Sequence, residues 1–428
     1  LFWLGFCRII TENYFTHTNS LLLEVCLSFG KLENTVKLKE KNREEVINVS
    51  TNIIFDIDEK KDTILDEDNK KELEEIVHEF KAGHYPNVVT KARAFRGKYK
   101  KEKISAFALL VEAISLAQIG AAKESAEVIS SLYHNPSGHT VDGLIELGEL
   151  AFLSDYKLSR RILSEAVKRM ENDIEEDRIK LARGYLVLGE AEENLEKFKR
   201  AVTYYKKGLN CFEESDKRDQ YMILFLHFKL GVLHSTINKP EDAIYYLDKT
   251  IELAGEPHKD IKINSLVSIA KTYGSMEKDD KAYEYLSKAI PLLENSSLKN
   301  RMVHAEALTE MAFYYFNQSR LEEAIPYYEQ AIHIYRGLTT YSARKIGMIY
   351  MQYAYCLEHK QNRNFSLAGR NYEFAVHELE KSNDRELLEN ALADVISFFD
   401  QRKNTKKKRY YENKFVKLTN TNADKVME

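Results

Sequence analysis

Apolar residues recur through most of this chain at positions i, i+3, i+4 and i+7, the spacing of a helix with one buried face. Three segments repeat the pattern almost unchanged: EDAIYYLDKTIEL begins at Glu241, DDKAYEYLSKAIPLL at Asp279 and EEAIPYYEQAIHIY at Glu322. The spacing identifies these segments as helices rather than strands. The sequence therefore predicts an all-α protein that contains internal repeats.

The repeats align on one alanine in each second helix, and successive copies are 39 to 44 residues apart: Ala201, Ala243, Ala282, Ala324 and Ala368. Small residues also stand twelve positions before the first four alanines, at Gly189, Gly231, Ala270 and Ala312. Small residues at fixed positions allow two antiparallel helices to approach closely, and larger residues fill the space between successive pairs. The aligned positions therefore predict a stack of helical hairpins.

Weaker copies extend the repeats in both directions. Upstream segments are predicted to form hairpins that turn at Gly83 and Gly120. Downstream, two final segments are typical of a terminal pair that caps a stack. We expect the repeat domain to run from about residue 68 to 418, with the clearest copies at 182–378 and a tail at 419–428.

The composition agrees with a helical protein, because only 6 prolines and 17 glycines occur in 428 residues. The net charge of −4 gives no whole-chain argument for nucleic-acid binding. One dense basic run, RKNTKKKRYYENK at residues 402–414, could contact phosphates, although such runs are more often the solvated face of a terminal helix.

The four cysteines lie far apart, which favours a reducing, cytoplasmic location. Cys356 and His359 form a single C-x-x-H pair, which is too little for a zinc site, so no metal or cofactor is expected. The first ten residues are apolar apart from Arg8, and this run is too short to span a bilayer. We therefore expect no membrane association.

The aligned pattern resembles the tetratricopeptide repeat, which has a period of about 34 residues. The resemblance implies a right-handed superhelix of antiparallel helix pairs with a concave groove. The proline that usually ends the second helix is replaced by Glu213, Gly255, Glu294 and Arg336, so these helices are predicted to be longer. Long repeats of this kind resemble those of the bacterial peptide-sensing regulators of the Rap, NprR and PlcR group.

The N-terminal sixty residues precede the repeats. Residues 1–20 form an apolar start of uncertain role, and residues 21–60 contain SFGKLEN, which resembles the end of the recognition helix in Cro-like helix-turn-helix domains. The first half of that domain's pattern is not recognisable, and Lys31 and Asn34 are the candidates to reach base edges. The alternative is a short helical segment without a DNA-binding role.

In the tetratricopeptide pattern, certain positions of each first helix face the groove. The candidates for binding a peptide there are Arg183, Glu190, Asn194, Phe228, Asn264, Lys271, Phe313, Asn317 and Tyr355. Amides can hold a peptide backbone, aromatic rings can take its side chains, and Arg183 or Lys271 can bind a carboxylate. The alternative is that these residues only pack or face solvent.

Three functions remain open. The resemblance implies a quorum-sensing transcription regulator that binds a short signalling peptide or a partner protein, with DNA contacted through the N-terminal segment. No common catalytic motif occurs, so enzyme activity is not expected from the residues. Rap-like phosphatase or sequestering action on response regulators is the second function, and a protein-binding scaffold is the third. A homo-oligomer is left open.

Overall fold

The computed structural model describes residues 69–420, except for short gaps at 100–101, 135–138, 173–177, 216–218 and 383. Within these ranges all regular elements are helices. They are α4 (Lys70–Lys81), α5 (Tyr85–Lys98), α6 (Glu102–Gln118), α7 (Ala122–Tyr133), α8 (Val141–Phe152), α9 (Tyr156–Glu171), α10 (Arg178–Asn194), α11 (Phe198–Glu214), α12 (Gln220–Thr236), α13 (Pro240–Leu253), the short 3-10 helix η1 (Glu256–His258), α14 (Lys259–Ser275), α15 (Asp279–Glu294), α16 (Met302–Asn317), α17 (Leu321–Gly337), α18 (Ala343–His359), α19 (Phe365–Leu379), α20 (Arg385–Gln401) and α21 (Thr405–Asn420).

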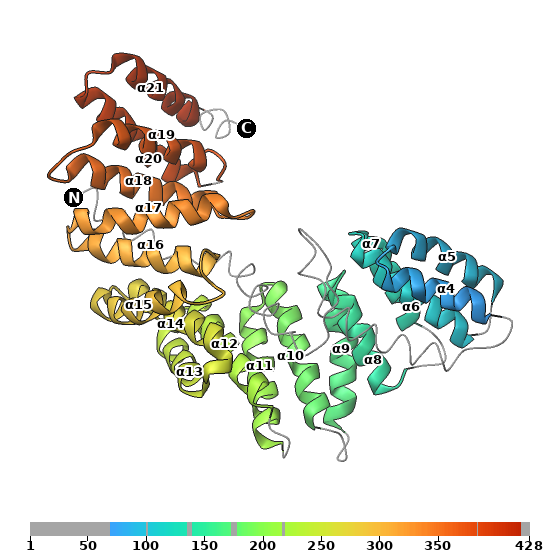
Figure 1. The fold of residues 1–428 in the computed structure, drawn as a ribbon. Coiled ribbons are helices and arrows are strands. Elements are labelled where there is room, and N and C mark those ends of the chain that lie inside the picture. Colours follow the sequence, from blue (N-terminus) through green and yellow to red (C-terminus); the bar gives the residue numbers. More distant parts are fainter. Residues whose placement is uncertain are drawn as a thin grey trace. The chain divides into compact units, whose positions relative to one another are not determined.

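The described helices form two compact units that divide between Asp242 and Ala243. The N-terminal unit comprises residues 69–242 of the described chain, and the C-terminal unit comprises residues 243–420. In both units consecutive helices pack as hairpins, as the coloured ribbon shows (Figure 1). The predicted all-α hairpin repeats are therefore confirmed.

Small residues bring the paired helices together as the sequence predicted. A side-chain carbon added to Gly189 on α10 would lie 2.3 Å from the ring of Tyr205 on α11. On the preceding hairpin, a carbon added to Gly148 would lie 2.4 Å from Leu163. Real carbon atoms do not approach so closely, so only glycine permits these contacts. Ala201 and Ala324, which belong to the aligned alanines, are fully buried.

The turns within the hairpins repeat one backbone conformation. Gly83 and Gly120 have φ angles of +76° and +80°, so the predicted turns at these glycines are confirmed. Later hairpins place a non-glycine residue in the same left-handed region, at Glu196, Asn238, Glu277, Ser319 and Lys403. The amide after each of these residues donates a hydrogen bond to a carbonyl five residues earlier, as in a helix-ending Schellman turn.

The second helices are longer in most repeats but not in all. Helices α11 and α17 each contain 17 residues and continue through Glu213 and Arg336, while α15 ends at Glu294. Helix α13 stops at Leu253, before Gly255. The prediction of longer second helices therefore fails for α13, where glycine and Pro257 follow at once and do not favour a helix.

In the C-terminal unit, the first helices of successive hairpins lie side by side. Helix α16 contacts α14 on one side and α18 on the other (Figure 1, gold to orange). The apolar core of this unit lies between first and second helices and includes Tyr328, Tyr335 and Phe399. The polar positions of α14, α16 and α18 are therefore the ones that can form a continuous surface.

Several predictions concern residues outside the described ranges. The helix-turn-helix segment at 21–60, with Lys31 and Asn34, lies there, as does the apolar start at 1–20. Among the helices that the structure describes, none is both long enough and apolar enough to cross a bilayer.

Candidate functional site: the faces of the first helices

An ion network centred on a buried carboxylate joins three first helices of the C-terminal unit. Glu306 on α16 accepts a hydrogen bond from Lys271 on α14 at 3.1 Å, through Oε2. Its other oxygen, Oε1, accepts one from Lys345 on α18 at 2.8 Å. Burial disfavours the charged Glu306 carboxylate, but the two lysines outweigh it and lower its pKa to about 2. The Glu306 carboxylate therefore stays charged and is shared by two lysines.

Polar groups near this network keep unused hydrogen-bonding capacity. Glu310 lies one turn after Glu306, and its Oε1 has no hydrogen-bond partner within the described structure. Burial raises the pKa of Glu310, against the attraction of Lys345 and Lys271. Asn264 is 1% exposed and donates to the carbonyl of Asp260 in its own helix at 2.8 Å, which leaves its Oδ1 without a partner. Both oxygens are enclosed by protein atoms, so a ligand could reach them only if neighbouring side chains moved.

Aromatic residues continue the same helix faces. Tyr355 on α18 stacks on His359 with ring centroids 4.0 Å apart, and contacts Phe316 on α16 edge-on. Phe313 is half-buried and packs against Tyr328. Asn317 is exposed at the end of α16, where its amide donates to Asp279 at 3.1 Å. These side chains could contact an extended chain that follows the first helices.

In the N-terminal unit, the candidates do not form one cluster. Arg183 is exposed, whereas Phe228 is 1% exposed and cannot offer its ring to a ligand in this conformation. Asn194 donates to the carbonyl of Glu190 in its own helix at 2.8 Å. Burial raises the pKa of Glu190, which Lys229 opposes. The binding roles predicted for these residues remain predictions.

The N-terminal unit contains a buried ion pair that connects three of its helices. Lys229 on α12 donates to Glu193 on α10 at 2.9 Å, and the Tyr205 hydroxyl donates to the same oxygen at 2.6 Å. All three side chains are buried. Burying two charges is costly unless they bond to each other and to further polar groups, as they do here. Because the three side chains come from α10, α11 and α12, their bonds hold these helices together.

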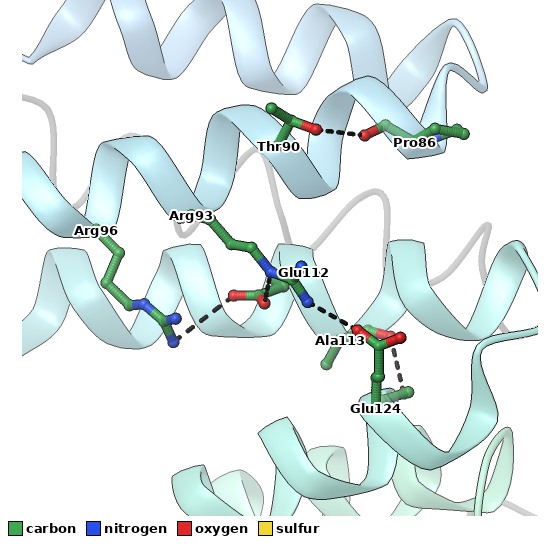
Figure 2. A network of polar contacts seen from close by, with 8 residues as sticks. Pro86, Thr90, Arg93, Arg96, Glu112, Ala113 and Glu124 are labelled. Atoms are coloured by element: carbon green, nitrogen blue, oxygen red, sulfur yellow. Dashed lines mark hydrogen bonds and ion pairs between the residues drawn. The ribbon is translucent and has the colours of Figure 1, made fainter.

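Arginines balance another buried carboxylate near the start of the repeats (Figure 2). Glu112 on α6 accepts a hydrogen bond from Arg93 on α5 at 2.6 Å, and Arg96 lies 3.6 Å from its other oxygen. Arg93 also reaches Glu124 on α7 at 3.0 Å. The network ties three helices together and explains why a buried acid is tolerated there.

Sequence reasoning found some of these residues and missed others. It selected Lys271 but missed its link through Glu306 to Lys345, because the three residues are 35 and 39 positions apart. Lys345 follows Glu306 by 39 positions, which is one repeat length, so the repeat spacing could have suggested it. Among the described residues, no group of three or more side chains is arranged to hold a metal ion.

The comparisons with known proteins define the class of fold. Residues 182–210 and 304–338 each match a model of the tetratricopeptide repeat. With the hairpins and small-residue contacts above, the described part of the chain has an all-α fold built from tetratricopeptide repeats.

The similar proteins include members of the Rap and NprR group. The response regulator aspartate phosphatase E of Bacillus subtilis (strain 168) is 27% identical over 146 residues, which cover 33% of this chain and 38% of the relative. The chain thus spans well under half of the length of that relative. The apo form of RapI has a TM-score of 0.54 at 13% identity and covers 83% of this chain and 98% of its own. The apo quorum sensor NprR from B. thuringiensis has a TM-score of 0.50 at 15% identity, covering 82% and 99%. The expected resemblance to this group is confirmed.

Proposed function

We propose that this protein is a regulator that binds a short peptide, or an extended segment of a partner protein, along its first helices. The observation that supports this most is the Lys271–Glu306–Lys345 network, which crosses three successive first helices. The two lysines are about a quarter exposed, so a ligand can reach them, and both share Glu306 as a partner. A carboxylate of the ligand, such as a free C-terminus, is the group that this surface attracts.

The test uses a pool of fluorescent pentapeptides with free C-termini and a matched pool with amidated C-termini. We expect the free pool to contain the tighter binders, because a charged hydrogen bond contributes more than a neutral one. Lys345→Gln should weaken the selected peptide about tenfold, whereas Lys288→Gln, an exposed change on the second helix α15, should leave affinity unchanged. Equal binding of both pools would argue against a carboxylate contact.

The remaining candidates of the sequence analysis are tested with the selected peptide. Asn194→Ala and Asn317→Ala remove one amide from each unit, and calorimetry then measures the change in affinity. Unchanged affinity in both variants would exclude these asparagines from the site.

The specific role that we propose is quorum-sensing transcription regulation. The support is the similarity in fold to the quorum sensor NprR and the position of the helix-turn-helix-like segment before the repeats. DNA would then be contacted through Lys31 and Asn34. A gel shift with promoter DNA, with and without the selected peptide, tests this role. Lys31→Ala should abolish the shift, and a shift that persists would exclude this contact.

A second candidate function is action on a response regulator, as a phosphatase or by sequestration. It is favoured by the sequence similarity to aspartate phosphatase E. Incubation with a phosphorylated receiver domain distinguishes phosphatase action from sequestration. Loss of phosphate from the receiver domain indicates a phosphatase. Co-elution of this protein with a receiver domain that keeps its phosphate indicates sequestration. A scaffold would bind other proteins and respond to neither DNA nor receiver domains.

A further inference from the structure

A second polar site lies at the C-terminal end of the repeats. Helices α18, α19 and α20 surround a pocket of about 130 Å³. A space of that size exceeds severalfold what a single water molecule needs. Its walls include Gln352, Tyr355 and Glu358 from α18, Tyr372 from α19, and Asp394 and Phe398 from α20. These side chains supply two carboxyl groups, three aromatic rings and an amide, and the wall also includes the polar side chains of His359, Ser397 and Gln401.

The two carboxyl groups have different surroundings. Glu358 is 7% exposed and is satisfied: its Oε2 accepts from the Tyr372 hydroxyl at 3.0 Å, and Arg402 lies 3.4 Å from its Oε1. Asp394 makes neither a hydrogen bond nor an ion pair with any described residue, and the charged group that influences it is Glu358. Burial and this like charge raise the pKa of Asp394 to about 6. One carboxylate of the pocket therefore lacks a counter-charge.

The amide of Gln352 is also incompletely bonded. Gln352 is 4% exposed, and its Oε1 accepts from the Tyr328 hydroxyl at 3.3 Å. Its Nε2 has no hydrogen-bond partner among the described residues, although the side chain lines the pocket. Because the side chain lines the pocket, the Nε2 donors are available to a polar group that enters it.

We propose that this pocket binds a cationic side chain, with arginine preferred over lysine. The guanidinium would donate to Asp394, and its flat face would stack on Tyr355, which is half-buried. The protein already uses this chemistry nearby, where Arg402 lies 3.5 Å from the centre of the Phe365 ring. The Gln352 amide can donate to a backbone carbonyl of the same ligand residue. This inference rests on the proposed peptide-binding function and names one residue that the peptide carries.

The first test uses two small probes, N-acetyl-arginine methylamide and the citrulline equivalent, which has the same shape without the charge. Saturation-transfer NMR measures their binding to the full chain. We expect the arginine probe to bind at least fivefold more tightly than the citrulline probe. Equal binding of the two probes would overturn the proposal.

Variants on α20 supply the matched control. Asp394→Asn should weaken the arginine probe about tenfold and leave the citrulline probe unchanged. Asp400→Asn removes the same charge from the same helix outside the pocket and should change neither. Wild-type affinity of the arginine probe for the Asp394→Asn variant would overturn the proposal. Thermal unfolding of both variants shows that they fold.

The pentapeptide pool separates this proposal from the proposed function. If no pentapeptide binds but the arginine probe does, the peptide-binding function fails while the cation pocket stands. If pentapeptides bind with the same affinity whether they carry arginine or citrulline, the cation pocket fails while the function stands.

Discussion

At the scale of single residues, two carboxyl groups of the C-terminal unit show how neighbours decide the charge of a buried acid. Glu306 lies between two lysines, and its pKa is lowered to about 2. Asp394 is largely buried beside Glu358 and forms no ion pair with a described residue, and its pKa is raised to about 6. The first acid therefore stabilises the fold when charged, and the second destabilises it.

We predict that Glu306→Gln lowers the free energy of unfolding at pH 7 by about 1–3 kcal/mol, because two part-buried lysines lose their shared partner. The folded-state pKa lies below the ordinary value of 4.5, so the contribution is present above pH 4.5 and is lost as the pH falls towards 2. Urea unfolding at pH 7 and pH 3 measures this, with the exposed Glu284→Gln as the control. A similar loss at both pH values would contradict the assignment.

Asp394 should show the opposite dependence. Its folded-state pKa of about 6 lies above the ordinary value of 3.8, so a penalty builds up between these pH values and stays constant at higher pH. The other titratable or charged groups around it are Tyr355, Glu358 and His359 on α18, Tyr372 on α19, and Arg402 after α20. We predict that Asp394→Asn raises the melting temperature at pH 7 but not at pH 4, as measured by circular dichroism. An increase of equal size at both pH values would show that the charge is not the cause.

At the scale of helices, the two helices of a hairpin are joined by a turn that contains one residue with a positive φ angle. In several repeats this residue is not glycine. Glu277 links α14 to α15 with a φ angle of +57°. A non-glycine residue is disfavoured there because its side chain crowds the following carbonyl group. The geometry is retained because the amide of Lys278 donates to the carbonyl of Tyr273 and ends α14.

We predict that Glu277→Gly stabilises the C-terminal unit by about 0.5–1 kcal/mol, since glycine adopts this conformation freely. The same change at Glu284, an exposed position within α15, should destabilise by about 1 kcal/mol. Denaturant unfolding of the two variants measures both effects. Destabilisation by both changes would show that the turn tolerates glutamate without strain.

At the scale of the whole molecule, each hairpin contacts mainly its sequence neighbours, so stability is expected to be local. Tyr328 on α17 is fully buried in the core of the C-terminal unit. We predict that Tyr328→Ala strongly lowers amide-exchange protection in α16, α17 and α18, because truncating a large buried ring typically costs about 3–5 kcal/mol. Protection in α5 to α9 of the N-terminal unit should not change. Hydrogen exchange followed by mass spectrometry tests this, and uniform loss through both units would indicate one cooperative fold.

The sequence by itself determined the helical hairpins, their small-residue contacts and the glycine turns at Gly83 and Gly120. These features were predictable because the helical period and glycine conformation are encoded locally. The sequence also pointed to Lys271 and Tyr355 as residues of the first-helix faces. It did not reveal their partners, the left-handed turns at Glu277 and Ser319, or the pocket.

Only the tertiary structure decided which charges meet and which do not. Lys271, Glu306 and Lys345 come together because three hairpins stack in register, and a change in the packing of any one would separate them. Asp394 and Gln352 share a pocket for the same reason, although they are 42 positions apart along the chain. The periodic pattern of the sequence specifies which face of each helix is apolar. The ion network and the pocket follow instead from how neighbouring hairpins pack against one another.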